Sequence, residues 1–168
     1  LKKNKPFFLP GFSNDIQYEL EVVVKISKLG KSISPKFAPR YYDEITAGID
    51  ITARDVQTRL SKSMLPWEIS KGFDGSAPIG DFIPVSSAGD IRNLDFRLEI
   101  NDLIVQQANT SDMIFGVDEL ISYISQYFTL KTGDLIFTGT PSGVGPLRRN
   151  DNLVAWIGEK PLLDFLIK

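Results

Sequence analysis

The sequence predicts an α+β fold in which strands predominate. Residues 94–100 alternate apolar and polar side chains, and the turn residues after them lead into a second apolar stretch, as in a β-hairpin. Residues 117–128 carry apolar side chains at helical spacing, which predicts an amphipathic helix. Two apolar runs near the end of the chain, residues 153–157 and 162–167, flank a glycine and predict another strand pair.

The first half of the chain predicts a long strand and short helices. Residues 16–26 are mostly apolar and predict one continuous strand after an irregular lead-in that contains prolines. Residues 34–42 predict a short helix, because a serine and a proline stand at its start. A short apolar run, residues 47–51, precedes a helix expected over residues 52–62, which would open with a capping box of its first residue and Asp55.

Irregular segments separate these elements. The segment from Lys71 to Pro84 contains three glycines and two prolines and predicts a loop. A strand over residues 135–138 is followed by a glycine-rich loop, residues 139–146. The chain has 168 residues, 42% of them hydrophobic, and neither a linker nor a repeat, so we expect residues 1–168 to form a single domain.

Composition excludes several classes of function. Nineteen basic and 21 acidic residues leave a net charge of -2 with no basic cluster, which argues against a nucleic-acid partner. No apolar run approaches the roughly 20 residues that span a bilayer, so we expect no membrane partner. The absence of cysteine excludes disulfides and thiolate metal sites and is consistent with a cytoplasmic location. The absence of histidine excludes a Ser-His-Asp triad, and any metal must be held by oxygen.

Carboxylates within apolar segments are the first candidate site. Glu19 and Glu21 are two residues apart in the predicted strand and should share one face. An exposed edge strand would explain them, but so would a hard divalent cation, since carboxylate oxygens suit magnesium, manganese or calcium. Asp50, just before the predicted helix, is a third candidate ligand, with a helix-capping role as the alternative.

Three further polar residues accompany the carboxylates. Arg54 and Gln57 are three apart and should lie on one helix face, where the guanidinium could bind a carboxylate; a surface salt bridge with Asp55 or Glu44 is the alternative. Lys71 lies in the predicted loop, where simple solvation is the alternative. The loop of residues 139–146 lacks the ending of a phosphate-binding loop, which argues against nucleotide binding.

Five stretches occur in an order that resembles the fumarylacetoacetate hydrolase family, in its acylpyruvate hydrolase and hydroxyhepta-dienedioate isomerase-like branch. They are YELEVVV, GIDITARDVQ, KGFDGSAPIGDFIP, QQANTSDMIF and LKTGDLIFTGTPSGVGP. The resemblance implies a mixed β-sandwich roll with a few flanking helices, a single catalytic domain, a homodimer, and one Mg²⁺ or Mn²⁺ per site, with Ca²⁺ as a further possibility.

Site residues carry over from these motifs. The resemblance implies Glu19, Glu21 and Asp50 as metal ligands and Lys71 as a catalytic residue that stabilises negative charge. It implies substrate contacts from four residues, which are Arg54, Gln57, Gly75 and Thr140.

The implied activity is hydrolysis of a carbon–carbon bond in a 2,4-dicarbonyl acid, such as an acylpyruvate, through an enolate that the metal stabilises. The same site would serve isomerisation of a hydroxymuconate-like dicarboxylate or decarboxylation of oxaloacetate, because these reactions share the enolate. A non-catalytic metal-binding homologue is the third interpretation. Many family members carry an upstream N-Y-x-x-H segment and an F-x-K-P segment, and neither occurs here. Since the chain starts at Leu1, we expect an N-terminal segment to be missing from it.

Overall fold

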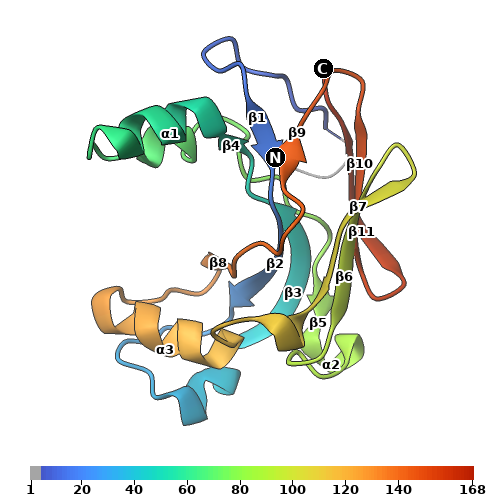
Figure 1. Ribbon diagram of the computed structural model, residues 1–168. Coiled ribbons are helices and arrows are strands. Elements are labelled where there is room, and N and C mark those ends of the chain that lie inside the picture. The colour runs from blue at the N-terminus through green and yellow to red at the C-terminus, as the bar shows by residue number, and fades with distance from the viewer. Residues whose placement is uncertain (1–4) are drawn as a thin grey trace.

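The computed structural model describes residues 5–168, whose strands form three sheets (Figure 1). Neighbouring strands within each sheet are antiparallel. The first sheet has the order β5-β3-β2-β8, with β2 Leu20–Ile26, β3 Tyr42–Ile49, β5 Ile83–Pro84 and β8 Leu135–Phe137. The second has the order β11-β10-β6-β7, with β6 Asp95–Ile100, β7 Leu103–Asn109, β10 Asn152–Ile157 and β11 Lys160–Leu166. The third is a small β4-β1-β9 sheet, with β1 Ile16–Tyr18, β4 Thr52–Ala53 and β9 Gly145–Pro146.

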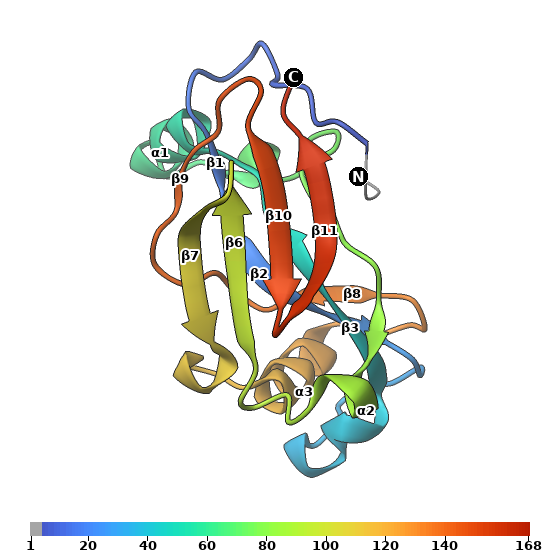
Figure 2. The ribbon, with the colours of Figure 1, turned by 90° about the vertical axis from the view of Figure 1, so that its right-hand side faces the viewer.

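The two four-stranded sheets pack face to face. Figure 2 shows the β11-β10-β6-β7 sheet from its outer side, with β2, β3 and β8 behind it. Strand β3 packs against β10 and β11, and β2 packs against β6. The core between the sheets is made of fully buried aliphatic side chains, among them Leu20, Ile49, Leu98, Leu153 and Leu163. This arrangement confirms the strand-rich α+β sandwich that the sequence predicts.

The helices flank the sheets, and the two longest lie on the left of Figure 1, away from the second sheet. They are α1 Arg54–Lys62, α2 Val85–Ala88, α3 Val117–Tyr127 and the short 3₁₀ helices η1 Pro35–Arg40, η2 Glu68–Ser70 and η3 Thr110–Asp112. Helix α3 packs against η1, so the short helix predicted over residues 34–42 is present and supports a longer one. No helix in the described part of the chain is long and apolar enough to cross a membrane.

Both predicted strand pairs are confirmed. Strands β6 and β7 form an antiparallel hairpin, and its two turn residues, Asn101 and Asp102, have φ of 52° and 66°. A two-residue turn with both residues in the left-handed region matches the twist of the strands that it joins. Strands β10 and β11 also pair, and α3 occupies the predicted amphipathic segment.

The prediction of one continuous strand over residues 16–26 is wrong, because the chain changes sheet at Glu19. Before this residue, β1 pairs with β4 and β9 in the small sheet. After it, β2 pairs with β3 and β8 in the larger one. Propensity could not reveal the break, because the partners that cause it are distant in sequence.

The predicted capping box at residue 52 is also wrong. Helix α1 begins at Arg54, and Thr52 lies in β4, where its hydroxyl donates to the carbonyl of Asp50 at 3.2 Å. The Asp55 carboxylate accepts hydrogen bonds from the Ser13 hydroxyl at 2.6 Å and the Asn14 N–H at 2.9 Å. Asp55 thus fastens the lead-in segment to the first turn of α1.

Candidate metal centre

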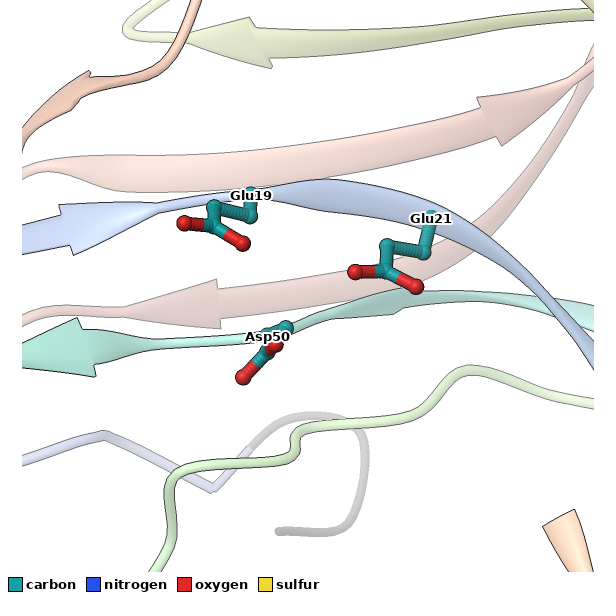
Figure 3. Close-up of side chains that lie close together, drawn as sticks. All are labelled: Glu19, Glu21 and Asp50. Atoms are coloured by element: carbon teal, nitrogen blue, oxygen red, sulfur yellow. The ribbon is translucent and has the colours of Figure 1, made fainter. Parts of the chain in front are cut away.

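Three carboxylates converge where the small sheet meets the larger one. Glu19, Glu21 and Asp50 each offer an oxygen, and these oxygens lie within 4.8 Å of one another. Figure 3 shows the three side chains turned toward a common space. Glu19 lies between β1 and β2, Glu21 lies in β2, and Asp50 directly follows β3. The β2–β3 register explains the placement, because it pairs Leu20 with Ile49 and thereby brings Asp50 beside Glu19. The Asp50 N–H donates to the Glu19 carbonyl at 2.8 Å.

The carboxylates are not those of an exposed edge. Glu19 is 8% exposed and Glu21 5% exposed, so the edge-strand explanation is wrong. A buried carboxylate needs hydrogen bonds and a cationic partner, because removing its charge from water is costly. The capping alternative for Asp50 is not what the structure gives, since its carboxylate accepts a hydrogen bond from a lysine.

Two cationic side chains approach the cluster. Lys71 Nζ lies 2.8 Å from Glu19 Oε2 and 2.6 Å from Asp50 Oδ2, which makes simple solvation the wrong interpretation of this lysine. Arg54 pairs with the other oxygen of Glu19 through its Nη2. Glu21 has no ion pair with any residue in the range 5–168 that the structure describes. If all five groups are ionised, the cluster keeps one net negative charge.

The surroundings shift the pKa values of the three carboxylates in different directions. Burial raises the pKa of Glu21 to about 7, and the charges of Asp50 and Glu19 add to this effect, although the Gly139 N–H opposes it. Burial also raises the pKa of Asp50 despite its hydrogen bond from Lys71. For Glu19 burial acts in the same direction, but the hydrogen bonds from Lys71 and Arg54 outweigh it and hold the pKa below its ordinary value.

These residues fit a hard divalent cation. The donor atoms are all carboxylate oxygens, which suit magnesium, manganese or calcium. A cation would also balance the negative charge of Glu21, the carboxylate that has no ion pair within the described part of the chain. The cluster could therefore hold a metal ion, which is one of the two explanations that the acidic spacing left open and the one that the family resemblance implies.

Arg54 and Gln57 lie on one face of α1, as predicted. Arg54 Nη1 donates to Gln57 Oε1 at 2.6 Å, and its Nε donates to Gln17 Oε1 at 2.9 Å. The alternative of a surface salt bridge is wrong, because Glu44 pairs with Lys25 at 2.6 Å and Asp55 binds the lead-in segment. Gln17 was not predicted as a site residue, although its position two residues before Glu19 could have indicated that its side chain lies near the carboxylates.

The loop after β8 completes the site on its other side. The Thr138 hydroxyl donates to the Val22 carbonyl at 2.8 Å, and the Gly139 N–H donates to Glu21 Oε2 at 2.6 Å. Thr140 Oγ1 accepts a hydrogen bond from Gln106 Nε2 at 3.0 Å. Gln106 was not predicted as a site residue, because Gln107 and Asn109 in the same strand carry the same kind of side chain and no local signal distinguishes it.

Gly75 lies in the turn that follows Lys71. Its φ is +77°, which a side chain would strain, and the adjacent Ser76 carbonyl accepts a hydrogen bond from Ile51 N–H at 2.8 Å. This contact ties the lysine loop to the residue after Asp50. The structure gives no contact between Gly75 and the three carboxylates, and its role toward substrate stays a prediction.

Comparison with known proteins decides the family. Residues 1–164 match the family model described as fumarylacetoacetate (FAA) hydrolase C-terminal. The chain belongs to the fumarylacetoacetate hydrolase family. The resemblance drawn from the five sequence stretches is confirmed, and so is the fold class that it implies.

The relatives of this family member are named after different reactions. The chain is 43% identical over 148 residues to an oxaloacetate decarboxylase of Dictyostelium discoideum, and the match covers 88% of this chain and 68% of the relative. It is 38% identical over 155 residues to an oxaloacetate tautomerase of Bos taurus, covering 92% and 70%. Both relatives are named as mitochondrial. A solved fumarylpyruvate hydrolase of Pseudomonas aeruginosa, in complex with Mn²⁺ and pyruvate, has 34% identity and a TM-score of 0.93 over 99% of this chain and 72% of that one.

This fumarylacetoacetate hydrolase family chain has a cavity of about 510 Å³ that is lined in part by the loop after β8. The loop after β8 forms one wall, and Gly139 links that wall directly to Glu21. Apolar side chains, among them Phe96, Met113 and Phe115, also line the cavity. The volume is large enough for a small organic acid.

Proposed function

We propose that this chain is the catalytic part of a divalent-metal-dependent enzyme that hydrolyses a carbon–carbon bond in a 2,4-dicarbonyl acid of the acylpyruvate type. The observation that carries the proposal is the convergence of Glu19, Glu21 and Asp50 with one arginine and one lysine. In this proposal the three carboxylates are ligands of Mg²⁺ or Mn²⁺. A family relative whose solved structure contains Mn²⁺ and pyruvate supports the choice of metal and of substrate class.

Charge supports an anionic substrate. The five ionised groups carry one net negative charge, and a divalent cation would turn this into one net positive charge. A bound cation would supply Lewis-acid chemistry to oxygens of the substrate. A 2-oxo acid brings a carboxylate and a carbonyl, both of which suit such a site.

The remaining side chains would hold the substrate. Arg54 and Gln57 already form a fixed pair, with 2.6 Å between Nη1 and Oε1, which suits binding of a carboxylate or carbonyl oxygen. Thr140 lines the cavity next to Gly139 and would donate a hydrogen bond to the substrate, and we retain Gly75 as a substrate contact.

Lys71 would act where negative charge develops. Hydrolysis adds water to the distal carbonyl, and when the carbon–carbon bond breaks its electron pair becomes the charge of an enolate. An ammonium group already held between Glu19 and Asp50 is fixed in position before reaction, and preorganised charge is a large contribution to rate. We therefore assign Lys71 as the catalytic residue that stabilises this charge.

A second candidate function is favoured by the named relatives. Two of them act, by name, on oxaloacetate as a decarboxylase or a tautomerase. Both reactions pass through an enolate, so the same carboxylates and cations would serve. The third candidate, a metal-binding homologue without catalysis, rests on the absence of histidine from the chain.

Assembly and location remain predictions. We propose a homodimer with a small oxo acid as its substrate, and no nucleic-acid or membrane partner. Exposed aromatic side chains support an assembly, since Tyr123, Tyr127 and Phe128 are each at least 60% exposed. The cytoplasmic location is proposed from the lack of cysteine alone, and the mitochondrial names of two relatives stand against it.

The test is a substrate panel with product analysis. Purified protein with Mn²⁺ or Mg²⁺ is mixed with acylpyruvates, fumarylpyruvate and oxaloacetate, and the loss of diketone or enol absorbance is followed. Hydrolysis gives two acids, decarboxylation releases CO₂, and tautomerisation leaves the mass unchanged, so mass spectrometry separates the candidates. A Glu21→Gln variant is the control for contaminating activity. If no substrate is converted in a metal-dependent way, the enzymatic proposal is wrong.

A further inference from the structure

Gln106 connects the carboxylate strand to the loop of Thr140. Its side chain is buried at 2% exposure in β7. Oε1 accepts a hydrogen bond from the Leu20 N–H at 2.9 Å, and Nε2 donates to Thr140 Oγ1 and to the Pro141 carbonyl, each at 3.0 Å. The orientation of the amide follows from its partners, because an N–H can only donate and a carbonyl can only accept.

Leu20 needs such a partner because β8, the strand beside β2 on this side, does not extend as far as Leu20. Strand β8 pairs with β2 only over residues 23–25. At Leu20 the backbone N–H would otherwise be left unpaired in a residue that is 0% exposed, which is unfavourable. The Gln106 side chain replaces the missing strand at the residue that separates Glu19 from Glu21.

The loop after β8 diverges from β2 step by step. Thr138 bonds directly to the Val22 carbonyl, at 2.8 Å through its hydroxyl. One residue later, Gly139 reaches only the side chain of Glu21, at 2.6 Å. At Thr140 the contact with the strand passes through the Gln106 amide. Gln106 therefore bridges the strand and the loop at the point where their direct contacts have ended.

Gln106 also determines how the Thr140 hydroxyl can be used. A hydroxyl has one hydrogen to donate and accepts through its lone pairs. Since Thr140 Oγ1 accepts from Gln106 Nε2, its own hydrogen is directed elsewhere. Thr140 lines the cavity whose wall Gly139 connects to Glu21, so that hydrogen is available to an acceptor oxygen bound there.

We propose that Gln106 is a positioning residue that fixes the Thr140 hydroxyl as a hydrogen-bond donor to an oxygen of the bound oxo acid. This inference rests on the proposed function, in which Thr140 contacts substrate. Gln106 itself does not contact the substrate and acts through Thr140.

Binding of oxalate to the Mn²⁺-loaded protein tests this role without any need for turnover. Calorimetry is applied to wild type, Gln106→Met, Thr140→Val and the double variant. We expect each single variant to weaken oxalate binding about 5- to 10-fold, the usual worth of one hydrogen bond. The double variant should bind no worse than Thr140→Val, because the two residues act as one unit. With a substrate that turns over, KM should rise in Gln106→Met more than kcat falls.

Controls separate this role from loss of stability. Ile157→Val shortens a core side chain in β10, 3% exposed, and should lower the melting temperature without changing oxalate affinity. If Gln106→Met does not fold, Gln106→Glu keeps an acceptor for Leu20 and removes the donor to Thr140. Unchanged oxalate affinity in the Gln106 variant, or independent losses that multiply in the double variant, would overturn the positioning role. Absence of oxalate binding to Mn²⁺-loaded wild type would overturn the proposed function, and this inference with it.

Discussion

Gly139 donates its backbone N–H to Glu21 Oε2 at 2.6 Å across 118 residues of sequence. Its φ of +100° is a conformation that glycine adopts freely and that strains any residue with a Cβ. No atom lies within 4 Å of where a Cβ would stand, so the restriction is one of backbone conformation and not of space. The residue type at position 139 therefore determines how the most deeply buried carboxylate of the site is held.

Gly139→Ala should weaken Mn²⁺ binding, because a shift of φ moves the N–H away from Glu21. Its stability cost should be about 1–2 kcal/mol, the cost of a side chain in the left-handed region. Gly133→Ala is a matched control, with a φ of +94° and equally open space in an exposed turn. Calorimetric titration with Mn²⁺ should distinguish the two variants. Equal Mn²⁺ affinity in both would mean that the Gly139 contact is irrelevant to the site.

Glu21→Gln should abolish tight metal binding and yet stabilise the metal-free protein above pH 7. The folded pKa of about 7 exceeds the ordinary value of 4.5, so the folded state disfavours the ionised side chain. This cost is absent below about pH 4.5, grows as the pH rises to about 7, and is full above it. Glutamine has nearly the same shape and no charge, so the gain should be on the order of 1–3 kcal/mol.

Thermal unfolding at pH 8 in a chelating buffer measures this gain, and Mn²⁺ calorimetry measures the loss of binding. Glu44→Gln is the control. Glu44 is not part of the cluster, and its carboxylate lies 2.6 Å from Lys25 Nζ in a partly exposed ion pair. If Glu21→Gln binds Mn²⁺ as wild type does, Glu21 is not a ligand.

Lys71→Met should reduce kcat by about 100-fold or more while leaving the site able to bind metal. The ammonium group contacts Glu19 and Asp50 and therefore competes with a cation for their oxygens. Mn²⁺ affinity should stay the same or increase. Lys62→Met, at the exposed end of α1, controls for the loss of a positive charge. A variant with normal kcat would contradict the catalytic role of Lys71.

The protein should be a dimer of 18.8 kDa chains in solution. The rings of Tyr123 and Tyr127 contact each other at a tilt of 59° with centroids 5.3 Å apart, and both residues are at least 60% exposed, which is unusual for an isolated chain. Light scattering coupled to gel filtration checks the mass, and Tyr127→Glu should shift it toward the monomer if this face is the interface. Leu103→Glu, at 70% exposure in the β6–β7 hairpin, is the control. A wild-type monomer at micromolar concentration would contradict the dimer.

Local sequence signals predicted most elements, and pairing between distant segments accounts for the errors. The hairpin at Asn101 and Asp102 has its own turn chemistry, and α3 has its own periodicity, so both could be predicted. The break at Glu19 arises from the strands that pair on either side of it, which the segment itself does not encode. The carboxylates were identified by their spacing and by the family motifs, and the β2–β3 register shows how Asp50 reaches them.

Gln106 illustrates what the sequence could not supply. It is one of three residues with side-chain amides in β7, with Gln107 and Asn109, and nothing near it in the chain identifies Leu20 or Thr140 as partners. Lys71 was suggested only by its motif, since its partners lie 52 and 21 residues away. Contacts of this kind depend on how the sheets and loops meet.

The change of sheet at Glu19 has a mechanical consequence. The chain passes directly between the small sheet and the larger one at Glu19 and again at Asp50, and the Asp50 N–H bonds these two crossings together at 2.8 Å. A cation held by both side chains would clamp this joint, so occupancy of the site and rigidity of the joint should change together. We expect amide hydrogens of β1 and β4 to exchange with solvent more slowly when Mn²⁺ is bound, while those of β10 and β11 keep their rates. The same three carboxylate oxygens would then serve both the chemistry of the site and the mechanical coupling of the two sheets.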